Sequence, residues 1–315
     1  MPLQKLQYRP GINRDVTSYT NEGGWVDSDK VRFRMGFPEK IGGWVKYSIN
    51  TYLGSARSLF SWVALSGTKF LGVGTNIKYY IVEGNTFEDI TPIRKTTTGS
   101  ATFSVADGFT VATVTDNTHG AVAGDFVTFS DAASLGGNVT AAVLNQEFEI
   151  QTVPTVNTYT INISATGNSS DSGNGGGSTV AKYQIDCGLD TQVGGTGWGA
   201  GTWGRSTWGS AADVTTENEL ALWSEDNFGE DLLLNLRDSA IYYWDKSGGV
   251  AARAVNLTSL SGASDTPTIS KQVMVSDNSR HVICFGANTL GSAVQDPLLI
   301  RFSSSESLTD WTPTA

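Results

Sequence analysis

The chain has 315 residues and a formal charge of -10; only 17% of its residues are charged, and it contains 36 glycines and 9 tryptophans. Few windows suit a long helix and many suit turns and strands, so the composition predicts an all-β protein. The acidic balance argues against a basic surface that binds nucleic acid by counterion release. Since no apolar run approaches the roughly 20 residues of a membrane span, we expect no membrane insertion.

The first 50 residues are polar and glycine-rich. Two Gly-Gly-Trp units, ending at Trp25 and Trp44, flank the run Lys30 to Arg34. In this run charged and apolar side chains alternate, which is the period of a strand with one wet face. We expect residues 1–50 to form an extended N-terminal arm whose glycine turns are anchored by indoles.

Residues 51–97 form the first of several similar units. Strands are predicted at Ser58–Leu65, Lys69–Val73 and Ile77–Val82, joined by short hairpin connections. The same pattern occurs in three stretches, residues 57–92, 219–257 and 272–313. Repeated hairpin units of this size are typical of β-propeller blades, which need neighbours to cover both of their faces.

Two sequence matches support the repeat. Placing Tyr79-Tyr80 on Tyr242-Tyr243 aligns the preceding strands without a gap, and the ending Asp89–Pro92 recurs at Asp310–Pro313 in three of four residues. Three copies are too few for a usual ring of four to eight blades. We therefore expect either that the chain is a fragment or that a partner completes the propeller.

Residues 98–183 differ from the repeats, because alternating Thr, Val and Ala replace the aromatic pairs. This pattern predicts a small β-sandwich or barrel inserted between blades. Its exit, residues 167–178, is rich in Gly, Ser and Asn and predicts a flexible linker. The remaining residues, 184–315, are expected to contain a Gly/Trp-rich segment followed by further blades.

Residues typical of catalytic, cofactor and metal sites are scarce. The two histidines, His119 in a predicted turn and His281 at the start of a strand, favour packing roles. The run Gly199–Gly204 matches a dinucleotide-binding glycine pattern, but no helical period follows it. Cys187 and Cys284 make no disulfide framework and are expected to be reduced. We predict no cofactor, no metal and no enzymatic activity.

Paired carboxylates are the strongest enzymatic alternative, because propellers host many glycosidases. The candidates are the pairs Glu225-Asp226 and Glu230-Asp231. Acid and nucleophile must face one pocket, whereas adjacent residues on a strand point to opposite faces. We therefore favour solvated turns for both pairs.

Tryptophans are the candidate assembly residues. Trp198, Trp203 and Trp208 recur every five residues beside glycines. They suit either a sugar platform or a hydrophobic strip that covers a neighbouring subunit, and we favour the strip. The full set of candidate interface residues is Trp25, Trp44, Trp198, Trp203 and Trp208.

Four segments together resemble a family: Arg9–Asn13, Trp25–Trp44, the Trp-Gly repeat and Leu222–Leu232. They look like virion tail proteins of tailed bacteriophages, similar to the stabilisation or nozzle proteins of podoviruses, and the insert resembles a small β module of phage tail proteins. The resemblance implies a homo-oligomeric ring of six subunits below the portal and adaptor.

Such a ring would connect head and tail, retain the packaged genome and form part of the DNA ejection channel. The implied partners are the portal and adaptor, tail fibres or other tail proteins, and double-stranded DNA in transit. The implied location is the virion tail, after assembly in the host cytoplasm. The alternative is a carbohydrate-binding or glycoside-cleaving propeller used in host attachment, which would need a convergent carboxylate pocket.

Overall fold

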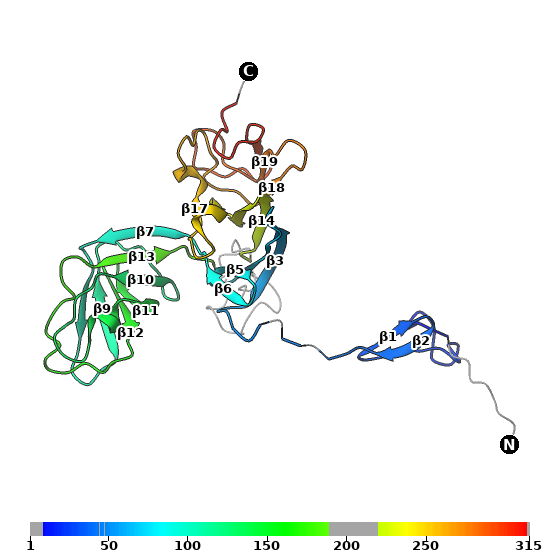
Figure 1. Cartoon of the computed structure of the whole chain (residues 1–315), viewed down its shortest axis with the longest axis horizontal. Coiled ribbons are helices and arrows are strands. Elements are labelled where there is room, and N and C mark those ends of the chain that lie inside the picture. Colours follow the sequence, from blue (N-terminus) through cyan, green and yellow to red (C-terminus); the bar gives the residue numbers. More distant parts are fainter. Residues whose placement is uncertain (1–8, 44, 47, 189–219, 314–315) are drawn as a thin grey trace, which may run out of the picture. The chain divides into compact units, whose positions relative to one another are not determined.

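The computed structural model describes residues 9–43, 45–46, 48–188 and 220–313, and the chain divides into two compact units, Met1–Ile49 and Asn50–Ala315 (Figure 1). In the first unit, β1 (Val31–Arg34) pairs antiparallel with β2 (Phe37–Lys40). The predicted alternation over this run is present in β1, whose side chains alternate between half-buried and exposed. Met35 and Gly36 both have positive φ, as a two-residue hairpin turn requires.

The second unit is almost entirely β-structure, as the composition predicted, and holds three antiparallel sheets that we name blades 1 to 3. Blade 1 contains β3 (Ala56–Val63), β4 (Lys69–Thr75), β5 (Tyr79–Glu83) and β6 (Thr86–Asp89). Blade 2 contains β14 (Trp223–Phe228), β15 (Asp231–Leu236), β16 (Ile241–Trp244) and β17 (Val255–Asn256). Blade 3 contains β18 (Gln272–Val275), β19 (Val282–Phe285) and β20 (Ile300–Phe302).

The blades stack face to face, with blade 2 in the middle. Strand β14 lies against both β3 and β18, so the first strands of the three blades are neighbours, as in a propeller. Blade 2 is buried on both faces, and Leu232, Leu233 and Leu234 of β15 are fully buried in succession. A strand covered on both faces reads as a continuous apolar run rather than an alternating one.

Aromatic side chains fill the interface between blades 1 and 2. Trp244 makes edge contacts with Trp62 and Phe70, at ring-centroid distances of 6.2 and 5.8 Å. Trp223 makes a similar contact with Tyr79 at 5.0 Å. Each such pair contributes about 0.5–1.5 kcal/mol beyond the burial of its surface. Aromatic side chains of β3, β4 and β5 therefore join blade 1 to β14 and β16 of blade 2.

The proposed equivalence of the two tyrosine pairs is wrong by one residue. Tyr79 and Tyr242 both belong to the core between blades 1 and 2, whereas Tyr80 and Tyr243 lie on the other faces of their blades. In the strand pairing, Tyr79 is opposite Gly74 and its counterpart in blade 2 is Ile241, opposite Asn235. One tyrosine of each pair therefore faces the interface between blades 1 and 2, and the other faces away from it.

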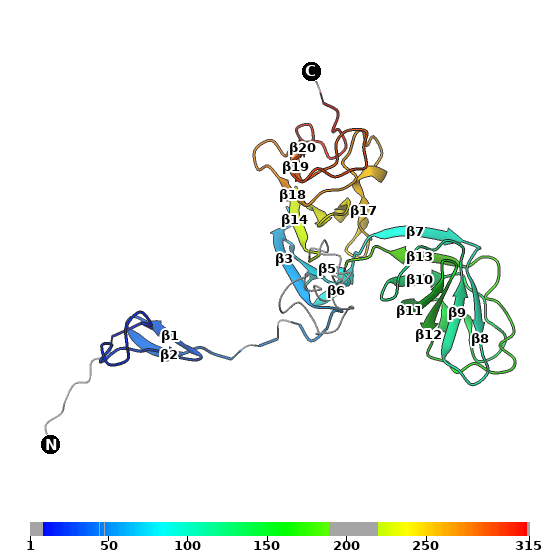
Figure 2. The same ribbon diagram turned by 180° about the vertical axis from the view of Figure 1, so that it is seen from behind.

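The insert is a curled seven-stranded sheet (Figure 2). Its strands are β7 (Ile93–Thr98), β8 (Thr102–Val105), β9 (Val111–Thr115), β10 (Phe126–Ser130), β11 (Glu147–Thr155), β12 (Thr158–Asn162) and β13 (Val180–Gln184), with the short helix α1 (Ala141–Leu144) between β10 and β11. The spatial order is β7-β13-β10-β11-β12-β9-β8. The sheet thus takes in Ile93–Thr98, ahead of the boundary at residue 98 drawn from the sequence. Alternate residues such as Val114 and Ile161 are fully buried in its core.

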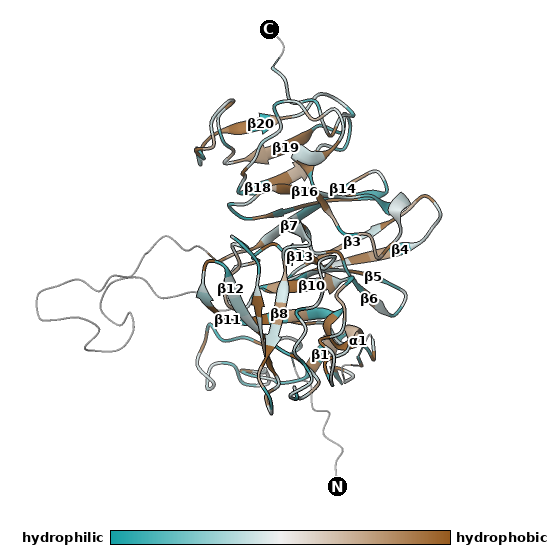
Figure 3. Cartoon of the chain, turned by 90° about the vertical axis from the view of Figure 1, so that its left-hand side faces the viewer, coloured by the Kyte–Doolittle hydropathy of each residue, from teal (hydrophilic) through white to brown (hydrophobic). Residues whose placement is uncertain are grey.

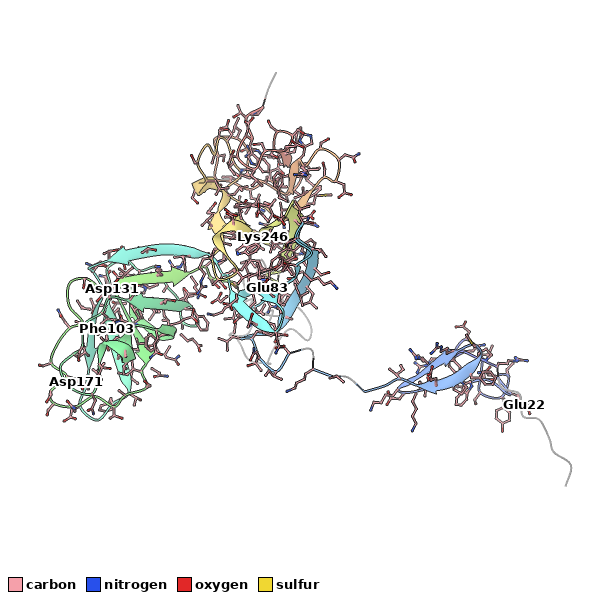
Figure 4. The ribbon with its side chains drawn as sticks, viewed as in Figure 1. Glu22, Glu83, Phe103, Asp131, Asp171 and Lys246 are labelled. Carbon is pink, nitrogen blue, oxygen red and sulfur yellow. The ribbon has the colours of Figure 1, made fainter. Side chains whose placement is uncertain are left out.

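The glycine-rich exit of the insert, expected to be a flexible linker, is instead bound to the module. The carboxylate of Asp171, a residue labelled in Figure 4, accepts four backbone N–H groups, from residues 137, 138, 139 and 168. The N–H of Gly173 donates to the carbonyl of Leu135 at 2.7 Å. A Cβ at Gly173 would lie 2.8 Å from that oxygen, so glycine is present because the backbones approach closely. Composition alone does not separate such a segment from a linker.

Two single-turn 3-10 helices, Lys246–Gly248 and Leu257–Ser259, complete the secondary structure of blade 2. Within the described residues, no helix is long and apolar enough to cross a membrane.

Candidate assembly interface

Blade 3 carries an exposed apolar face. Its strand pairing places Met274, Ile283 and Phe302 in one row across the sheet and Gln272, Phe285 and Ile300 in the next. Phe302 is 64% exposed, Ile300 55% and Met274 39%. Five of these six side chains are hydrophobic, and the hydrophobic character of β18 and β20 is visible in Figure 3.

The other face of the same sheet is buried against blade 2 through Val273, Val275, Val282 and Cys284. An antiparallel sheet with one packed face normally places polar side chains on its wet face. Blade 3 is apolar on both faces, as a blade between two neighbours is. A contiguous exposed apolar patch on a folded domain marks an interaction site. We therefore identify this face, the blade 3 face, as the candidate functional surface.

The far side of blade 1 is partly covered. The ring of Tyr52 packs on Phe87 at 5.2 Å and on Tyr80 at 6.1 Å. Along β3, however, Leu59 is 68% and Val63 60% exposed. The two side chains lie on one face of the strand, which is the face opposite to blade 2. This strip, the blade 1 edge, is a second exposed apolar surface of the stack.

Polar side chains tie the first strands of the blades together. Ser224 Oγ accepts the N–H of Val273 at 3.0 Å, and Asp226 Oδ2 accepts the N–H of Val275 at 2.7 Å. On the opposite side of β14, Glu225 accepts a hydrogen bond from Ser58 of blade 1. Adjacent carboxylates therefore point to opposite faces, as strand geometry predicted. The expectation of a solvated turn is wrong for this pair, because both residues lie in β14 between blades.

The second carboxylate pair, where β15 begins, also makes internal contacts. Glu230 accepts the N–H of Leu65 at 2.7 Å and pairs with Lys246 at 2.7 Å. Asp231 accepts the hydroxyl of Tyr243 at 2.6 Å. Lys246 is labelled in Figure 4. Glu230 thus bonds to the connection after β3 while its side chain stays 32% exposed in the turn before β15, as a turn residue was expected to be. Asp231 bonds within blade 2.

Burial affects the charge of Glu225. Desolvation raises the pKa of this carboxyl above its ordinary value, although the hydrogen bond from Ser58 lowers it in part. Burial, with the neighbouring charge of Glu225, also raises the pKa of the Tyr79 phenol. Ionisation of Glu225 between the blades therefore costs desolvation free energy.

A charged cluster that the sequence analysis did not identify joins the insert to the blades. Lys78 is only 2% exposed, and its Nζ lies 2.7 Å from Asp89 Oδ2 and 2.5 Å from Glu147 Oε2. Arg253 of blade 2 lies 2.8 Å from Asp89 and 3.6 Å from Glu147. Gln184 donates a further hydrogen bond to Glu147. Two cations and two carboxylates from three parts of the chain thus compensate one another.

The electrostatics of this cluster follow from its pairing. Burial raises the pKa of Asp89, but Lys78 and Arg253 outweigh burial and hold that pKa below its ordinary value. The ammonium of Lys78 also lies 4.6 Å from the ring centroid of Phe126. In the sequence, this buried cluster was indicated only by Lys78, a lysine inside the otherwise apolar run Ile77–Val82.

The histidines and cysteines lie in packed environments. His119 is 1% exposed and packs on Tyr159 at 4.9 Å, and burial lowers its pKa. His281 Nδ1 lies 2.7 Å from the carbonyl oxygen of Ser303. Cys187 and Cys284 are free and buried, and burial raises the pKa of both thiols. In the part of the chain that the structure describes, no three His, Cys, Asp or Glu residues are grouped to hold a metal.

Of the five candidate interface tryptophans, only Trp25 lies within the described residues. Its ring makes an edge contact with Phe33 at 5.9 Å, inside the N-terminal unit, and the residue is half-buried. Trp44, Trp198, Trp203 and Trp208 lie outside the described residues, as does the pattern Gly199–Gly204. Their role in assembly remains a prediction.

No protein-family model matches the chain, and no curated protein matches it. Among solved structures, the chain is similar to the Phage phi92 endosialidase at 12% sequence identity, with a TM-score of 0.24. The match covers 79% of this chain and 35% of that chain, so it spans about a third of the endosialidase. A likeness at this level carries no argument about function, which therefore rests on the residues of the chain itself.

Proposed function

We propose that this protein is a structural component of a bacteriophage tail rather than an enzyme. In this proposal it is a nozzle or stabilisation protein that forms a ring of six subunits below the portal and adaptor. The ring retains the packaged genome and forms part of the channel through which DNA leaves. The observation that carries the proposal is the blade 3 face, which has the apolar character of an internal blade surface and yet is exposed.

The polar contacts at the blade interfaces support a structural role. A glycosidase needs two carboxyl groups that face one pocket, about 5–5.5 Å apart in retaining enzymes and about 6.5–9.5 Å apart in inverting ones. Glu225 and Asp226 point to opposite faces of β14, and Glu230 and Asp231 bond to neighbouring connections. Glu225, Asp226 and Glu230 each bond to a neighbouring blade, and Asp231 bonds within blade 2, which is a structural use of all four carboxylates.

Net charge suits a channel component. The formal charge of -10 repels a polyanion, so double-stranded DNA would pass such a subunit without being held. A protein that grips DNA releases counterions through Lys and Arg contacts and has the opposite balance. The proposal therefore expects DNA to be a transient neighbour rather than a ligand.

Immunogold electron microscopy tests the proposal. An antiserum raised against the purified chain would be applied to virions of the phage that encodes it, with pre-immune serum as control. Gold particles confined to the tail, near its junction with the head, are expected. Virions that carry no label, although the same antiserum detects the protein in lysates of infected cells, would contradict a structural role in the tail.

A further inference from the structure

The structure points to a head-to-tail contact between copies of this chain, in which the blade 3 face of one copy seats on the blade 1 edge of a second copy. This inference rests on the proposed assembly role and specifies which surfaces carry it. We infer it from the order in which the blades pack within a single chain.

Blade packing within the chain has a direction. The face of blade 1 that bears Trp62 and Phe70 meets the face of blade 2 that bears Trp244. The opposite face of blade 2, with Leu233 and Tyr243, meets the buried face of blade 3. Each blade therefore offers a leading face to the next blade and a trailing face to the previous one.

Among the residues that the structure describes, the exposed apolar surfaces of the stack lie on the two blade faces that no other blade covers. The blade 3 face is a leading face, with Ile300 and Phe302 more than half exposed. The blade 1 edge is a trailing face, with Leu59 and Val63 exposed to a similar degree. Leu59, Val63, Ile300 and Phe302 are uncharged, so contact between them buries apolar surface; the exposed Lys69, the cross-strand partner of Val63, is their charged neighbour on the blade 1 edge.

A second copy is the occupant that fits, because it supplies a trailing face of the required kind and continues the interfaces already formed between blades. The two surfaces are different, so the contact is heterologous rather than isologous. Repetition of a heterologous contact gives a ring when the rotation closes. Blade 3 of each copy would then be followed by blade 1 of the next copy around the assembly.

A pair of blocking variants tests this contact. Phe302→Asp places a charge on the blade 3 face, and Leu59→Asp places one on the blade 1 edge. Phe109→Asp, in the insert, is the matched control, because Phe109 is 61% exposed against 64% for Phe302. All three sites are exposed, so folding should persist, and circular dichroism of each variant checks that it does.

Sedimentation velocity and mass photometry of the full chain supply the readout. We expect the wild type and Phe109→Asp to self-associate, and each blocking variant to weaken self-association by about thirtyfold or more, as loss of a central anchor does. An equimolar mixture of the two blocking variants should give a discrete dimer and nothing larger. Each partner in that dimer contributes its one intact surface, so only a head-to-tail contact produces it.

Three outcomes would overturn the inference. A wild type that is monomeric at every concentration would leave the blade 3 face to another partner. Loss of association in Phe302→Asp but not in Leu59→Asp would indicate an isologous contact. The third outcome is a mixture of the two blocking variants that forms no dimer. None of these results affects the location of the protein in the virion, so the tail proposal is tested separately by the gold label.

Discussion

Replacement of Lys78 by methionine should destabilise the protein through the charged cluster at the base of the insert. Methionine keeps most of the side-chain volume beside Phe126 but removes the ammonium that bonds to Asp89 and Glu147. Loss of one partner of a buried ion pair costs about 3–5 kcal/mol, because a charge is left uncompensated. Arg253 still neutralises part of that charge, so the lower end, about 3 kcal/mol, is expected.

Thermal unfolding followed by circular dichroism measures this effect. A loss of about 3 kcal/mol corresponds to a fall in Tm of roughly 6–12 °C for a unit of this size. Lys182→Met is the control, because Lys182 is an exposed lysine on β13 of the insert, and it should change stability by less than about 0.5 kcal/mol. A Tm for Lys78→Met equal to that of Lys182→Met would refute the assignment of the cluster as a stabilising junction.

The effect of Lys78→Met on Tm should also depend on pH. The pKa of Asp89 lies below its ordinary value in the folded protein because of Lys78 and Arg253. The contribution of Asp89 to the free energy of unfolding is therefore complete above the ordinary pKa of an aspartate, and it is lost as pH falls through the pKa of Asp89 in the folded protein. The difference in Tm between wild type and Lys78→Met should narrow in that acidic range. A difference that stays constant there would show that Asp89 is not the charge involved.

Three further predictions concern packing, charge and domain coupling. Gly74→Ala should lower the free energy of unfolding by about 1–3 kcal/mol, because its Cβ would lie 2.5 Å from an indole carbon of Trp223 in blade 2. Gly177→Ala is the control, because no atom lies within 4 Å of its Cβ position. Equal melting curves for the two variants would contradict the packing of blade 1 on blade 2. The stability of the wild type relative to Glu225→Gln should rise in urea titrations as pH falls from neutral, because burial raises the folded pKa of Glu225 above its ordinary value and protonation removes the cost of burying its charge. Deletion of residues 98–183 should leave folded blades, and Lys78→Met should lower the Tm of the deletion variant less than that of the full chain. Glu147 is then absent, and Arg253 still pairs with Asp89; an equal loss of Tm in both backgrounds would contradict this.

Local periodicity predicted much of the fold. Alternation and turn residues placed β3, β4 and β5 of blade 1 but missed its fourth strand, β6, and the aromatic pairs marked β5 and β16, which face other blades. The one-residue slip between Tyr79 and Tyr242 arose in the connections. Three residues join β4 to β5, and four residues, 237–240, join β15 to β16. An ungapped match cannot register that difference, and one residue is enough to exchange the two faces of a strand.

Long-range contacts account for what the sequence did not reveal. The carboxylate of Asp171 converts a segment of linker composition into a bound loop by accepting N–H groups up to 34 residues away. Lys78 meets Glu147 across 69 positions, and no local pattern distinguishes it from a solvated lysine. For Glu225 and Asp226, strand geometry predicted opposite directions, but burial between blades depended on the neighbouring sheets.

A cryo-EM map of the virion tail would test the central claim most directly. The account predicts that the tail contains this chain as stacked blades and that another β-sheet covers Ile300 and Phe302 of the blade 3 face. A tail that lacks the chain, or one in which these two side chains face solvent, would contradict it.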